Sequence, residues 1–454
     1  MATNVGETNG SRSQAHSPAK RIGMRVCMVS YSFYEGDNRV MRYAETLAKR
    51  GDEVEVIALR RRGQQCSENM NGVRVRRIQD RTINEKSRFS YLFRTALFFF
   101  RSMCAVSLSH LRKRYSLVHV HSVPDFLVFS AWLPRLTGAR IVLDIHDLLP
   151  ELYAIKFGSG AGSLIFRILQ SVERVSAAFA DHVIAANHIW HQKLILRSMP
   201  AWKCSVLLNF PDRSIFRPRG QGRRDGKFVF LYPGTLSWHQ GLDIAIRAFA
   251  KIKDEFPQAE FQIYGEGSRK QSLMALARDL GLQGRVLFHA SVSLREIAGI
   301  IEKADLGVVA KRKDSFGNEA FSTKILEFMA VGVPVVVSDT AIDRYYFSER
   351  TVTFFRSGDP DDLARCMREL IRDPEARQRQ IRNATEFVGQ NDWDSKKDEY
   401  LKLVDSLVSN SRQSDMEARR NHEAASVQLP DRGLPQLNSD ISRSRARQPE
   451  ISDK

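Results

Sequence analysis

The sequence predicts an α/β protein made of two doubly wound domains that face each other across a cleft. Short apolar strands alternate with helical segments through both halves of the 454-residue chain, which is typical of parallel sheets covered by helices. A segment rich in Pro, Arg, Gly and Asp, residues 209–226, separates the halves and is predicted to be a linker. A chain of this length is long enough for two such cores.

The first domain is predicted over residues 24–208. It follows a polar segment, residues 1–23, which lacks the apolar stretch of a signal peptide and is expected to be a disordered lead. A helix over residues 39–50 is expected to end at Gly51, because glycine commonly follows the last turn of a helix. The predicted strands of this domain are residues 25–30, 53–58, 117–120, 140–144 and 182–186.

The second domain is predicted over residues 227–392. Residues 393–408 are predicted to form a last helix that crosses back to the first domain, and the polar residues 409–454, which lack aromatic side chains, are expected to be disordered. In doubly wound domains a ligand binds beyond the carboxyl ends of the strands. The predicted strands of this domain are residues 228–232, 260–264, 286–288, 306–309 and 334–337.

Charge and cysteine content limit the partners and the compartment. The net charge is +17, and residues 21–120 hold 20 basic against 9 acidic residues, whereas residues 411–454 hold 8 against 7. A basic first domain favours nucleic acid or an anionic membrane as partner; no nucleic-acid motif is present, so nucleic acid is not expected. The five cysteines are scattered, which argues against a zinc site or a disulfide framework and suits a reducing compartment.

Residues 89–115 are predicted to form a helix that is apolar apart from one polar stripe. The stripe consists of Arg94, Thr95, Arg101, Ser102, Ser109 and Arg112. The longest uncharged stretch, Ser102–His110, is far short of the roughly 20 residues that span a bilayer. Two interpretations stay open and are compatible: a core helix that covers a sheet, and an interfacial helix with Arg112–Arg114 on lipid headgroups.

The segment from Gly317 to Asp339 carries the most specific functional pattern. Its two carboxylates, Glu319 and Glu327, are separated by seven residues, and the pattern around them reads as loop, helix, sharp turn and buried strand. Glu319 lies before the helix and Glu327 lies inside it, so both carboxylates can line one pocket at a helix N-terminus, where backbone N–H groups favour a phosphate.

This segment resembles the E-x7-E signature of the retaining, nucleotide-sugar-dependent glycosyltransferases of the GT-B fold, the large bacterial family 4 group. The resemblance extends in pieces from Met24 to Leu401. It implies two Rossmann-like domains and a nucleotide diphosphate sugar as donor. It also implies that Glu327 binds the ribose, that Glu319 lies beside the donor sugar, and that the backbone of Ala320, Phe321 and Ser322 holds sugar hydroxyls or phosphate.

Two histidines at strand ends are further candidates. His121 ends the strand at 117–120 and matches the position of the family's active-site histidine; its placement predicts a role in transfer rather than in folding. His146 ends the next strand and is a candidate for binding the acceptor or orienting His121. His119 is predicted only to support the loop. Gly36 lies in the first strand–helix loop, where relatives bring backbone close to the donor phosphate.

The loop after residues 228–232 departs from the family pattern. Gly234 is present, but Thr235 and Gln240 occupy places where many relatives carry an arginine and a lysine that hold the diphosphate. Lys324, three residues before Glu327, is the best alternative cation, and Lys311, Arg312 and Lys313 are the second choice or else a solvated loop.

Neither a metal nor a cofactor is expected. Asp359-Pro360-Asp361 imitates a metal-binding Asp-x-Asp, but the residues that follow favour a helix cap. Gly265-Glu266-Gly267 lacks the third glycine of a dinucleotide fingerprint.

The sequence thus predicts a retaining hexosyltransferase that acts on a glycan or lipid-linked acceptor in exopolysaccharide, capsule or lipopolysaccharide synthesis. It is expected in the cytoplasm, as a peripheral protein at the inner face of the cytoplasmic membrane. The alternatives are a nucleotide-sugar epimerase or hydrolase of the same fold, and a non-catalytic protein that binds a sugar nucleotide. Consumption of a nucleotide sugar with a defined acceptor separates the first hypothesis from the others.

Overall fold

The fold is taken from a computed structural model that describes residues 23–81, 88–157, 163–218, 220 and 225–409. The expectations of a disordered lead and a disordered tail therefore lie almost wholly outside the described residues. The described residues belong to one compact unit, which holds all of the elements below.

The first domain is built on an eight-stranded sheet with the order β3-β4-β2-β1-β5-β6-β7-β8. Its strands are parallel except for the antiparallel pair β3 and β4. They are β1 (Arg25–Ser30), β2 (Glu53–Arg60), β3 (Ser67–Met70), β4 (Val73–Asp80), β5 (Leu117–His121), β6 (Arg140–Ile145), β7 (His182–Ala185) and β8 (Cys204–Val206).

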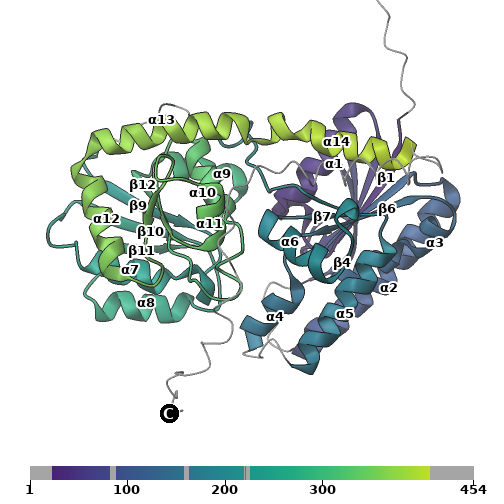
Figure 1. The fold of residues 1–454 in the computed structure, drawn as a ribbon, viewed down its shortest axis with the longest axis horizontal. Helices are drawn as coiled ribbons and strands as arrows, with labels where there is room; N and C mark the ends of the chain where they lie inside the picture. Colours follow the sequence, from purple (N-terminus) through teal and green to yellow (C-terminus); the bar gives the residue numbers. More distant parts are fainter. Residues whose placement is uncertain (1–22, 82–87, 158–162, 219, 221–224, 410–454) are drawn as a thin grey trace, which may run out of the picture. The chain divides into compact units, whose positions relative to one another are not determined.

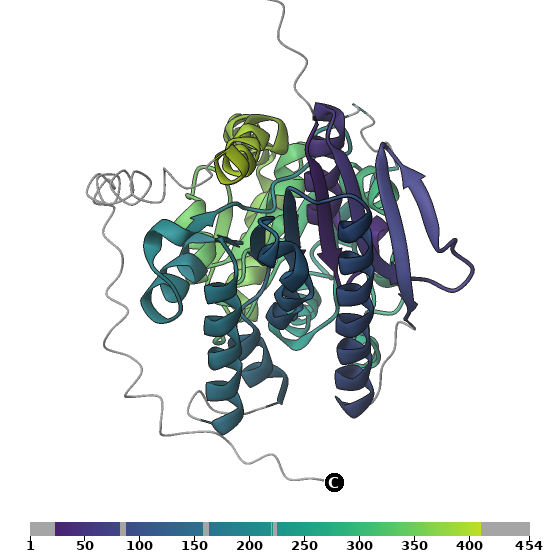
Figure 2. The same cartoon turned by 90° about the vertical axis from the view of Figure 1, so that its right-hand side faces the viewer.

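Helices cover both faces of this sheet (Figure 1). A 3-10 helix, η2 (Asp125–Ala131), packs against β5 and β6 and has α2 on one side and α5 on the other. Figure 2 shows α2 and α5 as two long, roughly parallel helices of this domain. The helices are α1 (Asn38–Arg50), α2 (Arg88–Arg112), α3 (Trp132–Leu136), α4 (Leu149–Phe157), α5 (Leu164–Phe179) and α6 (His188–Arg197).

The second domain has a six-stranded parallel sheet with the order β11-β10-β9-β12-β13-β14. Its strands are β9 (Phe228–Pro233), β10 (Ala259–Tyr264), β11 (Val286–His289), β12 (Leu306–Val309), β13 (Val335–Ser338) and β14 (Thr353–Phe355). Its helices are α7 (Leu242–Ala250), α8 (Lys270–Asp279), α9 (Leu294–Glu302), α10 (Thr323–Ala330), α11 (Ala341–Tyr346), α12 (Pro360–Arg372) and α13 (Pro374–Gln390).

The predicted fold class of two doubly wound α/β domains is confirmed. The sequence did not reveal four strands. β3 reads Ser-Glu-Asn-Met and is largely exposed, β8 and β14 have three residues each, and β4 has eight residues but carries Arg77 and Gln79 at two of its four buried positions. Such segments carry too little apolar periodicity to be recognised.

The last described helix, α14 (Trp393–Ser409), packs against α1 of the first domain, whereas α13 packs against α10 of the second. The Tyr400 ring stacks on Tyr43 with 4.3 Å between ring centroids. Trp393 Nε1 donates to Thr46 Oγ1 over 2.9 Å. The end of the described chain therefore belongs to the core of its first domain.

The orientation of α2 differs from the usual pattern of a surface helix. The hydroxyl-bearing members of the predicted polar stripe, Thr95, Ser102 and Ser109, are buried. Apolar side chains, among them Phe93 and Phe100, are exposed instead. The prediction of one polar stripe was correct as a pattern, but half of the stripe faces the protein rather than water.

Candidate functional site

A cavity of about 250 Å³ lies where α10 begins, and residues from both domains line it. Ser322 precedes α10, and its side chain makes no capping hydrogen bond, so the first backbone N–H groups of the helix are not capped by it. The Ser322 hydroxyl is itself buried without a hydrogen-bond partner. The cavity is lined by Asp147, Leu152, Thr235, Ser237, His239, Gln240, Lys311, Phe316, Ala320, Phe321, Ser322, Thr323 and Lys324.

Lys324 reaches this cavity because residue 234 is a glycine. A Cβ atom at Gly234 would lie 2.2 Å from Lys324 Cε, and Gly234 has a φ of +148°, a conformation that side chains disfavour. Within the described chain, Lys324 has no ion pair within 4.0 Å. Burial, with a further contribution from Lys311, lowers the pKa of Lys324, while Glu327 opposes the shift. The site thus holds a cation that no carboxylate contacts.

Glu327 lies one turn further along α10 and is half-buried. Burial raises the pKa of its carboxyl, and Lys324 and Arg42 act in the opposite direction. Arg42 comes from α1 of the first domain, where burial and the neighbouring Arg39 lower its pKa to about 10. Two cations from different domains therefore act electrostatically on this carboxylate.

The two positions that depart from the family pattern both line the cavity. The Tyr232 hydroxyl lies 2.9 Å from the Thr235 carbonyl oxygen and 3.0 Å from Gln240 Oε1. Neither Thr235 nor Gln240 brings a charge. Two lysines line the cavity, and Lys311 is paired with Asp343, whereas Lys324 has no carboxylate partner among the described residues. His239, which the sequence analysis did not single out, also lines the cavity; burial lowers its pKa.

One alternative for residues 311–313 was a solvated loop, but the side chain of Lys311 is buried and paired. Its side chain is 2% exposed, and its Nζ lies 2.9 Å from Asp343 Oδ2 and donates to the Ala320 carbonyl oxygen over 2.8 Å. Arg312 is paired with Asp243 and stacks 3.7 Å above the Trp238 ring. Lys311 thus fixes the loop that carries Ala320, and both residues are weaker sources of a free cation than Lys324.

Glu319 forms an ion pair and a hydrogen bond with residues of the first domain. Lys193 Nζ on α6 lies 2.7 Å from Glu319 Oε2, and Asn187 Nδ2 donates to the Glu319 carbonyl oxygen over 3.1 Å. The sequence placed Glu319 in the loop before the helix, where it is found, but gave no sign of Lys193 because the two residues are 126 positions apart. The loop continues through Ala320, Phe321 and Ser322, all of which line the cavity.

His121 belongs to a buried polar cluster at the carboxyl edge of the first sheet. The strand register places Ser30, His121 and Asp144 side by side. His121 Nδ1 lies 3.2 Å from Asp144 Oδ2, and His146 Nε2 lies 2.9 Å from the same oxygen. Arg39 donates to both Asp144 oxygens over 2.7 Å. Sequence reasoning missed Arg39 and Asp144, although Asp144 ends a predicted strand next to that of His121.

The electrostatics of this cluster follow from burial and from the Arg39–Asp144 pair. Burial opposes ionisation of Asp144, but Arg39 and His146 hold its pKa well below the usual range. Burial lowers the pKa of His121 despite Asp144. For His146, burial also disfavours the proton, but Asp144 raises the pKa above its ordinary value.

The histidines of this cluster differ in exposure. His121 is 0% exposed, whereas the side chain of His146 is 21% exposed. Asp147, the next residue, lines the cavity, and burial raises its pKa. His119 Nδ1 lies 3.0 Å from the Tyr400 hydroxyl of α14, so it contacts the last helix rather than the loop. His121 is therefore as much a core residue as a site residue.

Gly36 ends a short 3-10 helix, Tyr34–Gly36, that follows β1, and it is exposed. A Cβ atom there would lie 3.4 Å from Arg61 Nη2, which is an ordinary contact. Gly36 is not among the residues that line the cavity, and neither are Glu319, Glu327, His121 and His146, so its approach to a donor phosphate stays a prediction.

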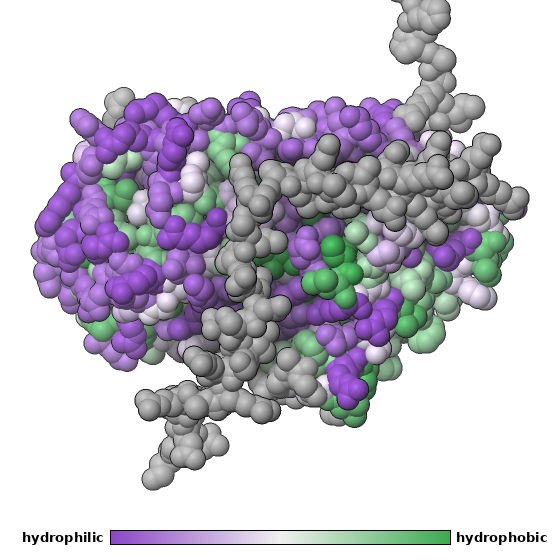
Figure 3. All heavy atoms as spheres, viewed as in Figure 1, coloured by the Kyte–Doolittle hydropathy of each residue, from purple (hydrophilic) through white to green (hydrophobic). Residues whose placement is uncertain are grey.

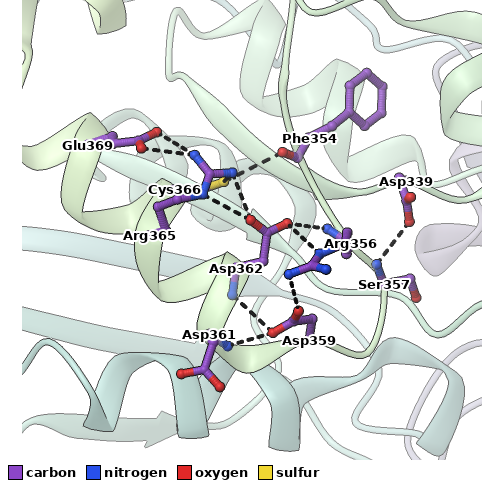
Figure 4. A network of polar contacts seen from close by, with 10 residues as sticks. All are labelled: Asp339, Phe354, Arg356, Ser357, Asp359, Asp361, Asp362, Arg365, Cys366 and Glu369. Carbon is purple, nitrogen blue, oxygen red and sulfur yellow. Dashed lines mark hydrogen bonds and ion pairs between the residues drawn. The ribbon is translucent and has the colours of Figure 1, made fainter.

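Two places could be taken for metal sites, and the residues present fit neither. Donor atoms of His119, His121 and Asp144 lie within 4.8 Å of one another, but both Asp144 oxygens already accept from Arg39. Asp359 caps α12, as predicted: its side chain accepts from the backbone N–H groups of Asp361 and Asp362 over 2.9 and 3.0 Å. Figure 4 shows this cap together with Arg356 and Arg365, which pair with the same aspartates.

Comparison with known proteins places both domains in described families. Residues 36–209 match the family described as "Glycosyl transferase 4-like domain", and residues 215–387 match "Glycosyl transferases group 1". An uncharacterised glycosyltransferase of Methanocaldococcus jannaschii is 25% identical over 78% of this chain and 89% of its own length.

Solved structures share the fold. Sucrose-phosphate synthase from Thermosynechococcus elongatus aligns with a TM-score of 0.70 and 19% identity, over 86% of this chain and 100% of its own. Anabaena HepE in complex with UDP-glucose gives 0.64 and 17%, over 85% and 100%. WaaG, described as a glycosyltransferase involved in lipopolysaccharide biosynthesis, gives 0.63 and 17%, over 85% and 100%. At these identities the likeness establishes the fold.

Proposed function

The chain belongs to the GT-B glycosyltransferases of the family 4 type, and from that premise we propose that it moves a hexosyl group from a nucleotide diphosphate sugar to a glycan or lipid-linked acceptor with retention at the anomeric carbon. The observation that carries the proposal is the presence of Lys324 and Glu327 one turn apart on the same helix. Gly234 makes room for Lys324 at a cavity that both domains line.

Each part of a nucleotide sugar finds a matching group. Lys324 and the backbone N–H groups at the start of α10 offer positive charge to the diphosphate. Glu327 accepts hydrogen bonds from the ribose hydroxyls. Glu319 and the backbone of Ala320 and Phe321 are available to the sugar once Lys193 releases the Glu319 carboxylate.

The transfer proposed is a front-face displacement. The bond between the anomeric carbon and the diphosphate oxygen breaks, and a bond from that carbon to the acceptor oxygen forms on the same face. The acceptor proton passes to an oxygen of the leaving phosphate, so no protein nucleophile is required. Lys324 compensates the negative charge that gathers on the leaving group. No metal and no cofactor enter this scheme.

The acceptor class and the location belong to the same proposal. A role in exopolysaccharide, capsule or lipopolysaccharide synthesis at the inner face of the cytoplasmic membrane is supported by the basic first domain and by the lipopolysaccharide pathway named for one structural neighbour. The five cysteines are free, which suits the cytoplasm.

A thermal-shift screen with nucleoside diphosphates and nucleotide sugars tests donor binding directly. The preferred donor is then incubated with lipid-linked glycans, and the anomeric configuration of the product is determined by NMR. Retention with transfer supports the proposal. Inversion, release of free sugar, epimerised donor, or binding without turnover each contradicts it; the last outcome would fit the neutral Thr235 and Gln240.

A further inference from the structure

The exposed apolar side chains of this protein are concentrated on three neighbouring helices. Of the sixteen large hydrophobic side chains that are exposed in the described chain, eleven lie on α2, α3 and α5. We call them the three-helix surface. Its members are Leu92, Phe93, Phe100, Leu108 and Leu111 of α2, Trp132 and Leu136 of α3, and Leu164, Ile165, Ile168 and Val175 of α5.

The side chains of α2 form one continuous outward stripe. Phe93, Phe100 and Leu111 are 70%, 56% and 70% exposed, and their spacing of seven and eleven residues keeps them on one face of a helix. A helix of a water-exposed domain normally turns its apolar side inward. In α2 hydroxyl groups are turned inward, and they are satisfied there: Thr95 donates to the Tyr91 carbonyl and Ser109 accepts from Arg76.

The charges on these helices have one sign at the surface. Arg101, Arg112 and Arg167 are exposed, and within the described chain none of them has an ion pair with a carboxylate. The sequences of α2 and α3 contain no acidic residue. Glu173, in α5, is 0% exposed and pairs with Arg197. The three-helix surface therefore combines apolar side chains with three exposed arginines that form no ion pair within the described chain, although Asp80 lies close enough to Arg101 for Arg101 to lower its pKa.

The three helices are linked in space through η2, which each of them contacts. Both α2 and α5 pack against η2, and α3 packs against α2. Figure 2 shows α2 and α5 as two roughly parallel columns of the first domain, with other elements of that domain between them. In Figure 3 hydrophobic residues gather at the lower right, over the region where Figure 1 places α2 and α5.

We propose that the three-helix surface docks this protein onto an anionic lipid bilayer, with its apolar side chains at the acyl boundary and its arginines on lipid phosphates. Apolar area and electrostatic attraction to anionic lipid are the two contributions that hold interfacial helices. A second copy of the chain is a poorer occupant, because a self-complementary contact would bring the unpaired arginines of two copies together.

Docking here means lying on the bilayer rather than crossing it. Tyr91–Arg112 is long and apolar enough to span a membrane by length and composition. However, its inner face packs against η2, α3 and β4 of the folded domain. The inference rests on the proposed function in one respect only: a lipid-linked acceptor would be met at this surface.

The test is co-sedimentation of the full chain with vesicles of phosphatidylcholine alone and of phosphatidylcholine mixed with phosphatidylglycerol. We expect binding to the mixed vesicles that weakens with added salt, and little binding to phosphatidylcholine. The triple variant Phe93→Gln/Phe100→Gln/Leu108→Gln and the variant Arg101→Gln/Arg112→Gln should each lose at least tenfold in affinity. The control Met274→Gln/Val292→Gln/Arg278→Gln, exposed positions of the second domain, should bind as the wild type does.

Several outcomes overturn the inference. In the first, the wild type fails to bind the mixed vesicles; in the second, the triple variant binds them as tightly as the wild type does. A third outcome is that light scattering shows the wild type, but not the triple variant, to form a dimer as its concentration rises; the surface would then be a contact between two copies of the chain. Nucleoside diphosphate affinity, measured in solution on the same variants, should stay unchanged. If the protein binds vesicles but no nucleotide sugar, the proposed function is wrong and the docking surface is supported. If it binds a nucleotide sugar but no vesicles, the docking surface is wrong and the proposed function is supported.

Discussion

Lys324 is a lysine whose charge is kept available by its surroundings. Thr235 and Gln240, which line the same cavity, are neutral; a carboxylate lies one turn away rather than in contact, and a glycine occupies the position that a side chain would otherwise fill. A cation that lacks a counter-ion in a partly dry site gains more from an anionic ligand than a surface lysine does. The diphosphate is the anion that the proposed reaction supplies.

Lys324→Gln should therefore weaken nucleoside diphosphate binding more than nucleoside binding. A hydrogen bond to a charged group contributes about 1.5–3 kcal/mol, so we expect a loss of roughly tenfold to a hundredfold in calorimetry with the diphosphate. Lys313→Gln, at an exposed position eleven residues earlier, is the matched control. Equal losses for both ligands would mean that Lys324 supports only the helix.

The lowered pKa of Lys324 predicts how this affinity depends on pH. Only the protonated amine attracts the diphosphate, and burial has moved its pKa below the ordinary 10.5. Affinity should thus be lost as the pH rises through the lowered pKa, at a lower pH than an ordinary lysine would give. Lys324→Arg should retain affinity at alkaline pH, because a guanidinium stays charged. An identical alkaline loss in both proteins would assign the titration to another group.

Glu327 is predicted to accept hydrogen bonds from the ribose hydroxyls of the donor. Glu327→Ala should reduce affinity for a nucleoside diphosphate at least tenfold, since it removes hydrogen bonds to a carboxylate. The same substitution should have little effect on a 2′,3′-dideoxynucleoside diphosphate, which lacks the hydroxyls concerned. A comparable loss for the dideoxy ligand would show that the carboxylate acts on Lys324 instead.

At the scale of elements, the ends of β5 and β6 are held to α1 by a buried ion pair. Arg39 of α1 binds both oxygens of Asp144, and His121 and His146 contact the same carboxylate. The loop after β6 then delivers Asp147 to the cavity. The residues that pack the core at the ends of β5 and β6 thus also position the edge of the site. For this reason His121 cannot be treated as a surface catalytic residue.

Asp144→Asn should lower stability strongly, because it leaves the Arg39 charge buried without its partner. Breaking such a pair costs about 3–5 kcal/mol, which urea unfolding would measure. Asp361→Asn, on the exposed first turn of α12, is the control and should cost less than about 0.5 kcal/mol. His121→Ala is accordingly expected to lower Tm as well as turnover, in contrast to the expectation from sequence. A wild-type urea midpoint for Asp144→Asn would mean that the pair contributes no stability.

The sequence predicted elements where local pattern decides them. The strands around His121, His146 and Glu327 alternate with helices, and the helix that carries Glu327 follows directly from the spacing of its apolar residues. Contacts across long sequence separations were not predictable: Arg39 with Asp144, Lys193 with Glu319, and Gly234 with Lys324 are each set by how distant elements pack. The inward-facing hydroxyls of α2 were missed because periodicity gives the stripes but not their direction.

At the scale of the whole described molecule, the Lys193–Glu319 ion pair joins the two domains at the site itself. The Lys193 side chain is 35% exposed, so the pair contributes about 0–1 kcal/mol and a donor sugar can displace it. Lys193→Gln should leave Tm nearly unchanged and raise donor affinity by no more than about fivefold, the factor that corresponds to 1 kcal/mol.

Calorimetry with the donor and with the nucleoside diphosphate checks this expectation, since only the donor carries the sugar that competes for Glu319. Lys203→Gln, outside the site, serves as the comparison. Weaker donor binding by Lys193→Gln would contradict the prediction and would instead make Lys193 a contact of the sugar.

The packing of α14 on α1 has a consequence for biosynthesis. Tyr43 of α1 shares one core with Trp393, Tyr400 and Val404, yet a ribosome that has finished the first domain still has about 200 residues to translate before the chain reaches residue 409. At about 5–20 residues per second, the nascent first domain waits roughly 10–40 seconds with that aromatic surface uncovered. A ribosome stalled in the second domain would therefore carry a first domain that is nearly complete but lacks α14, with the aromatic surface of α1 uncovered. We expect chaperones near the exit tunnel to bind such a nascent chain.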